Sequence, residues 1–198
     1  MDISVQPVKH FLDSVDSVLN SNTFIVEFEA VHPDPEESVR QFLDSGDFTE
    51  QLVQQDRERD WYMFSDPDKT GHCFRIRPGS LLESIPSLTI GYPACDKREY
   101  LIGMLTGDTS KGSFFSFYRK EKSRKEAEII VDNLTAYLSS YSGEWDLFTI
   151  KPDFLKRTGR TYPKGENLKY FEGDFANDTA TLIRHRDKVF LILTNGID

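Results

Sequence analysis

Two short stretches of the chain carry carboxylates at spacings that phosphoryl-transfer chemistry uses. Asp66 and Asp68 stand two residues apart in a segment that follows the hydrophobic run 61–64. A carboxylate in such a position can attack phosphorus, and a second one can protonate the leaving oxygen. Further along the chain, Asp174 and Asp178 offer carboxylate oxygens, the ligands that Mg²⁺ prefers. The bound ion would in turn bind the phosphate of the substrate.

These stretches resemble the first and last signatures of the haloacid-dehalogenase phosphatases and P-type pumps. The resemblance implies Asp66 as the nucleophile, Asp68 as the acid/base and Asp174 and Asp178 as magnesium ligands, in a doubly wound parallel sheet.

The residues around these stretches predict a different structure. Residues 65–71 lie between two expected strands, 61–64 and 72–77, which are spaced as a hairpin. The chain after Asp178 alternates like a pair of strands, where that family has a helix. Asp, Asn, Gly and Pro are also the residues that hairpin loops need for their backbone angles. We therefore interpret both stretches chiefly as turns.

A second charged set lies at alternate positions of two expected strands. Glu27 and Glu29 share one strand face, and Arg75 and Arg77 share another. This arrangement resembles the start of a triphosphate-tunnel enzyme of the adenylate-cyclase/thiamine-triphosphatase type. The resemblance implies a barrel in which the glutamates hold Mg²⁺ or Mn²⁺ and the arginines hold triphosphate. Val31 stands where that family has lysine, and ordinary cross-strand charge pairs on a half-buried sheet are the alternative explanation.

Hydrophobic periodicity predicts the elements that must position these residues. Helices are expected at 6–20, as one or two short helices near 35–56, and as a long helix near 123–142 that begins with a Ser123–Glu126 capping box. The expected strands are 23–31, 61–64, 72–77, 88–91, 100–105, 113–119, 145–150, 167–171, 179–184 and 189–194. Together they predict a single α+β domain over residues 1–198, with a largely antiparallel sheet that could be strongly curved.

The cysteines and the hydropathy of the chain bear on its surroundings. Cys73 and Cys95 are expected to be reduced thiols of a cytoplasmic protein, because two cysteines in 198 residues do not make a disulfide framework. No Cys-x-x-Cys or His-x-x-x-His spacing predicts a metal site, and no cofactor is expected. No apolar run reaches the length that crosses a bilayer, so no membrane partner is expected.

Charge is the strongest guide to a partner. The net charge is −9, and residues 1–60 hold 14 acids against 4 bases, a net of −10. Such a surface repels nucleic acid and favours a protein with a basic surface.

We therefore predict a non-enzymatic, acidic protein-binding module. Its size and acidity are similar to those of toxin-neutralising immunity proteins, which mask a basic surface by electrostatic complementarity, and an adaptor protein would share them. The expected binding residues form an acidic run: Asp34, Glu36, Glu37, Asp44, Asp47 and Glu50. The alternative is a metal-dependent phosphohydrolase that uses either of the two charged sets above.

Overall fold

The computed structural model describes most of the chain in several segments. These are residues 2–60, 90–112, 114, 116, 118–140, 143–150, 179–186 and 188–196. They form, in order, α1 (Gln6–Leu19), β1 (Ser21–Glu29), α2 (Pro35–Asp44), α3 (Gly46–Glu58), β2 (Ile90–Gly91), α4 (Lys97–Thr106), α5 (Arg124–Ser139), β3 (Asp146–Ile150), β4 (Thr179–His185) and β5 (Lys188–Gly196).

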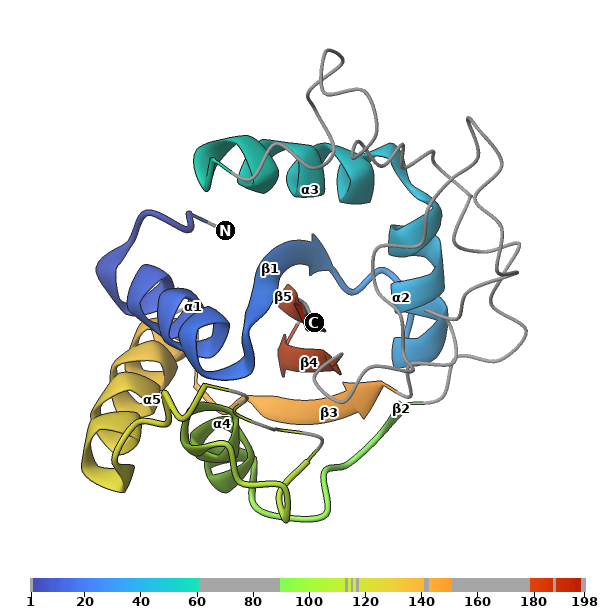
Figure 1. Ribbon diagram of the computed structural model, residues 1–198. Helices are drawn as coiled ribbons and strands as arrows, with labels where there is room; N and C mark the ends of the chain where they lie inside the picture. The colour runs from blue at the N-terminus through green and yellow to red at the C-terminus, as the bar shows by residue number, and fades with distance from the viewer. Residues whose placement is uncertain are drawn as a thin grey trace, which may run out of the picture.

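The described strands form one antiparallel sheet in the order β1-β5-β4-β3-β2 (Figure 1). β4 and β5 form the expected hairpin, and β1 pairs with β5 from Ser21↔Gly196 to Glu29↔Lys188. The prediction of an α+β fold with a largely antiparallel sheet is confirmed. The sheet is open, with β1 and β2 at its edges, so the described strands form neither a closed tunnel nor a parallel doubly wound sheet.

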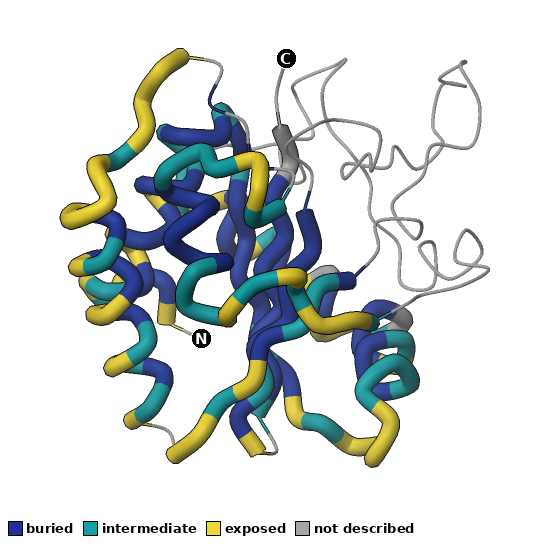
Figure 2. Tube along the Cα trace, turned by 90° about the horizontal axis from the view of Figure 1, so that it is seen from below, coloured by how far each residue is buried: buried dark blue, intermediate teal, exposed yellow. Residues whose placement is uncertain are grey.

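Helices α1, α4 and α5 cover one face of the sheet. The buried side chains of α1 recur at helical spacing, and those of α5 do the same after its Ser123–Glu126 capping box. They meet the inward residues Ile25 of β1, Ile183 of β4 and Phe190 of β5 in one apolar cluster. Figure 2 shows the buried residues gathered along the strands and on the helix faces that cover them.

Helices α2 and α3 cover the opposite face, which makes the molecule a three-layer structure. Alternate residues of β1, including Phe24 and Phe28, point to this side because successive side chains of a strand face opposite ways. Phe42 of α2 stacks on Phe28 with ring centroids 4.2 Å apart, and meets Phe48 of α3 edge to face at 5.5 Å. α2 begins at Pro35 with Asp34 as its cap, which agrees with the helix expected near residue 35.

The expected strand over residues 100–105 is wrong, because this segment lies in helix α4. The Asp96 side chain accepts hydrogen bonds from the backbone N–H groups of Arg98 (2.8 Å) and Glu99 (3.3 Å) and so begins the helix. Gly107 ends it with a left-handed φ of 63°, which glycine adopts readily. All residues from 100 to 105 are buried, and an apolar run of this kind does not distinguish a buried helix from a buried strand.

The expected strand over residues 113–119 is also absent where the structure describes it. Phe114 and Ser116 lie in irregular backbone, and Arg119 has a φ of 51°. Phe114 is nevertheless fully buried, with its ring edge to face against Tyr100 at 5.0 Å. Phe114 therefore belongs to a loop that packs on the core, and not to a strand. The expected strands 61–64, 72–77 and 167–171 lie outside the described residues.

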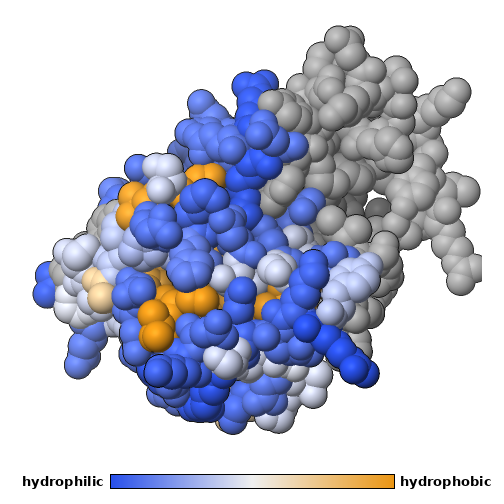
Figure 3. All heavy atoms as spheres, turned by 60° about the vertical axis from the view of Figure 1, so that its left-hand side comes forward, coloured by the Kyte–Doolittle hydropathy of each residue, from blue (hydrophilic) through white to orange (hydrophobic). Residues whose placement is uncertain are grey.

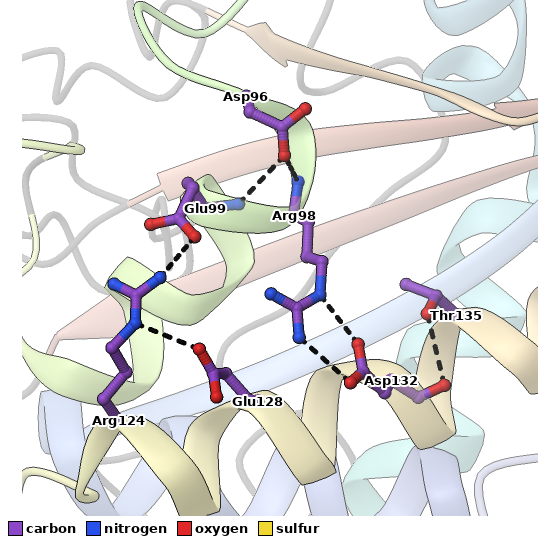
Figure 4. Close-up of polar contacts among 7 residues, drawn as sticks. All are labelled: Asp96, Arg98, Glu99, Arg124, Glu128, Asp132 and Thr135. Carbon is purple, nitrogen blue, oxygen red and sulfur yellow. Dashed lines mark hydrogen bonds and ion pairs between the residues drawn. The ribbon is translucent and has the colours of Figure 1, made fainter.

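Charged side chains join α4 to α5 on the surface (Figure 4). Arg98 of α4 makes two hydrogen bonds to the Asp132 carboxylate, at 2.7 and 2.9 Å. Arg124 of α5 contacts both Glu99 of α4 at 2.6 Å and Glu128 of its own helix at 3.0 Å. Some of the charged residues on this side of the molecule therefore pair with one another within the fold.

Candidate functional site: a groove beside the edge strand

Strand β1 lies at an edge of the described sheet, and the glutamines of α3 cover part of its outer side. The Gln55 side chain accepts a hydrogen bond from Ile25 N–H (3.1 Å) and donates one to the Ile25 carbonyl (2.7 Å). Gln51 makes the same pair of bonds to Glu27, at 2.9 and 2.7 Å. Each amide therefore acts as a neighbouring strand would, and the spacing of four residues along α3 matches that of two along β1.

The beginning of β1 is covered in a similar way by a residue of α1. The Asp16 carboxylate accepts hydrogen bonds from the backbone and the hydroxyl of Thr23, and Arg59 pairs with both Asp16 and Asp13. Burial raises the pKa of Asp16, although Arg59 and Thr23 act to lower it. Covering of this kind keeps an edge strand from pairing with other chains.

Among the described residues this cover ends at Glu27, and a groove of about 480 Å³ lies beside the rest of the strand. We refer to it as the edge groove. Its walls come from the end of β1, from α2, from the start of α3 and from Lys188 of β5. The residues that line the edge groove include Glu27, Glu29, Gln41, Phe42, Asp47 and Lys188.

The charges of the edge groove are mainly negative. Lys188 Nζ lies 2.9 Å from a carboxylate oxygen of Glu27 and 3.6 Å from one of Glu29. The hydrogen bond with Glu27 raises the pKa of Lys188. Partial burial acts to raise the pKa of Glu27, but hydrogen-bond donors and positive charge, Lys188 among them, bring it below its usual value. Both groups are therefore ionised at neutral pH, and Glu29 and Asp47 add further negative charge.

The structure divides five of the six predicted acidic residues into two groups. Asp34 and Glu36 make contacts within the fold: Asp34 caps α2, and a Glu36 oxygen accepts a hydrogen bond from Ile90 N–H at 3.0 Å, which joins α2 to β2. Asp44 lies in α2, and nothing is described of its side chain.

The other three acidic residues lie at or near the edge groove. Asp47 lines it from the first turn of α3, and Glu50 follows three residues later on the exposed surface of the same helix. Glu37 accepts a hydrogen bond from Gln41, which lines the groove, at 3.0 Å. The structure thus brings Glu37, Asp47 and Glu50 to the same corner as Glu27 and Glu29.

Several residues of this site were not predicted from the sequence. Lys188 lies opposite Glu29 in the register of β1 and β5, which pairs residues far apart in the chain. Gln51 and Gln55 are spaced as neighbours on a helix surface, and that spacing was the only signal available for them. The remaining residues of the two enzyme resemblances, Arg75 and Arg77 together with Asp66, Asp68, Asp174 and Asp178, lie outside the described residues.

Two further findings concern the described residues alone. No group of three or more His, Cys, Asp or Glu side chains in them is arranged to hold a metal ion. None of their helices combines the length and the apolar character that crossing a membrane requires.

Comparisons of the chain with protein-family models, with curated proteins and with solved structures find no match.

Proposed function

We propose that this protein is a non-enzymatic binding module whose α2–α3 corner docks a protein with a basic surface. The observation that carries the proposal is that Glu29 and Asp47 line the edge groove, where Glu27 already engages Lys188. Glu37 and Glu50 lie one helical turn from the lining residues Gln41 and Asp47. A concave surface with one sign of charge attracts and orients an oppositely charged partner. Toxin-neutralising immunity proteins and adaptor proteins are classes that use such a surface.

The distribution of bases supports this location. Of the four bases in residues 1–60, Lys9 and Arg59 pair with acids of α1, away from α2. Of the other two, Arg57 lies in the last turn of α3, at the opposite end of that helix from Asp47, and Arg40 lies in α2 itself. Of these four bases, Arg40 alone lies in the same helix as Glu37, so acids outnumber bases at the α2–α3 corner.

The side of the molecule that carries α1 and α5 is less suited to docking by apolar contact. Figure 3 shows this face as largely hydrophilic, with hydrophobic residues in small separate areas. Protein interfaces that rely on apolar burial use larger continuous patches. Among the described residues, the charge of the edge groove therefore indicates a docking surface better than the apolar areas of the α1 and α5 side do.

Charge reversal tests the proposal. A Glu37→Lys, Asp47→Lys, Glu50→Lys variant should capture less of a basic partner from the source organism than the wild type does. With that partner purified, its association rate constant should fall by about tenfold or more at low salt, because steering is lost, with a smaller change in dissociation. Glu36 is left intact because its contact with Ile90 belongs to the fold.

Two results would contradict the proposal. One is an unchanged association rate constant for a variant that folds normally. The other is hydrolysis of a triphosphate or phosphoester with Mg²⁺ or Mn²⁺, accompanied by a rise in melting temperature with the same ligands, which would favour the phosphohydrolase alternative.

A further inference from the structure

In the described part of the chain, the hydrogen bonds from α3 to the main chain of β1 stop at Glu27. Ile25 and Glu27 present their N–H and C=O groups to the outer edge, where the α3 amides bind them. By the alternation of a strand, Glu29 presents its own groups to that edge as well. Among the glutamines of α3 that bind β1, Gln51 is the one nearest the start of the helix, and it binds Glu27. Within the described part of the chain, no side chain of α3 reaches the main-chain groups of Glu29.

In the structure β1 ends at Glu29. β5 begins at Lys188, directly opposite Glu29, and the described residues of the β4–β5 hairpin give Ala30 and Val31 no partner. The sequence nevertheless favours a strand as far as Val31, whose side chain is 71% exposed. Within the described residues, these two positions therefore continue β1 at its edge without a strand partner.

The edge groove runs beside this uncovered part of β1. Phe28 and Phe42, stacked at 4.2 Å, contribute an apolar surface to it, and Glu29 and Asp47 contribute carboxylates. An extended segment placed along Glu29–Val31 would direct alternate side chains toward these groups. Its lysine or arginine side chains would be near the two carboxylates.

We propose that the edge groove accepts an extended, lysine- or arginine-bearing segment of the partner, which adds a strand to β1 at residues 29–31. The main-chain hydrogen bonds of such an added strand supply affinity, and the alternate side chains supply specificity. This inference rests on the proposed function and names the form in which the basic partner is recognised. The α3 glutamines then have a second effect: they limit strand addition to the end of β1 that lies beside the acidic groove.

The probe for this inference is a short capped peptide of alternating lysine and valine. Its control is the same peptide with N-methyl groups on the amides of one edge, which keeps the charge and removes the donors. The unmodified peptide should slow hydrogen exchange of the Glu29 and Val31 amides, and the N-methylated peptide should bind about tenfold more weakly or worse. Equal binding of the two peptides, or binding with no protection at these amides, would overturn the inference.

A pair of protein variants gives an independent readout. Val31→Pro removes the N–H donor of residue 31, whereas Val31→Thr keeps it and keeps the strand preference. Because Val31 is exposed, both variants should fold with nearly the wild-type melting temperature. We expect Val31→Pro alone to weaken peptide binding; equal affinities of the two variants would contradict strand addition.

The two proposals can fail separately. If charge reversal at Glu37, Asp47 and Glu50 slows the natural partner but that partner leaves exchange at Glu29 and Val31 unchanged, the docking surface stands and strand addition is wrong. If the partner protects these amides but its association rate is unchanged by the charge reversal, a strand is added to β1 without recognition by the acidic residues, and the proposed function is wrong.

Discussion

At the scale of single residues, His185 is an ionisable group enclosed in the fold. It ends β4, its side chain is 1% exposed, and neither ring nitrogen has a hydrogen-bond partner in the described structure. Burial lowers the pKa of His185, and the neighbouring charge of Arg186 lowers it further. A protonated imidazole is therefore less favourable in the folded protein than in the unfolded chain.

The expected consequence is a loss of stability in mild acid. A histidine whose folded pKa is depressed takes up its proton preferentially in the unfolded chain. The contribution of His185 to the free energy of unfolding should thus fall as the pH drops below about 6.5, the usual value for histidine, toward the lower folded pKa, whereas the raised pKa of Asp16 acts in the opposite direction. His185→Phe and His185→Leu should each reduce this fall in urea titrations at about pH 7.5 and about pH 5. The exposed His10, changed to Phe, is the matched control and should leave the fall unchanged; if the His185 variants behave as that control does, the buried imidazole is not responsible.

At the scale of elements, the docking of α3 on β1 depends on side-chain amides. Gln55 is 5% exposed and satisfies both main-chain groups of Ile25. Gln55→Leu keeps a similar volume but leaves two buried polar groups unpaired, and we expect a loss of about 1–3 kcal/mol in the free energy of unfolding. Gln54→Leu makes the same chemical change at an exposed neighbour whose amide contacts only Glu58 among the contacts described for it. It should have a much smaller effect, and equal losses in the two variants would show that the amide contacts to β1 do not matter.

Helices with local sequence signals were predicted correctly, whereas a helix without a hydrophobic period was not. The periodicity of α1 and the capping box of α5 are local signals, and both predicted helices were found. The run Tyr100–Leu105 is buried on all sides, so its apolar residues have no period, and only the weaker signals of Asp96 and Gly107 indicate a helix.

The site was less predictable because it depends on tertiary contacts. Asp34 and Glu36 look like any other acids in the sequence, yet the fold uses them for a helix cap and for a contact with β2. Lys188 joins Glu27 and Glu29 only through the register of β1 and β5. A sequence pattern can indicate that acids cluster, but not which of them remain available at the surface.

At the scale of the whole molecule, the net charge of −9 and the local charge of the α2–α3 corner make separable contributions to docking. The net charge acts over distances up to about a Debye length and attracts any basic partner, whereas the charges of the groove act mainly at contact. Two exposed acids allow a comparison: Glu50 lies on α3 near the groove, and Glu121 precedes α5, whose helix packs on the opposite face of the sheet.

Glu50→Lys and Glu121→Lys change the net charge by the same amount, so a purely global effect would slow association with the basic partner equally. If docking occurs at the α2–α3 corner, Glu50→Lys should slow association several-fold more than Glu121→Lys at low salt, because the electrostatic energy falls with distance from the bound cation. Added salt at about 0.5 M should bring the two rate constants together, since it screens charges beyond a few ångströms. Stopped-flow measurement across a salt series provides the comparison. Equal slowing at every salt concentration would place the docking surface elsewhere, and a larger effect of Glu121→Lys would move it toward the α5 side of the sheet.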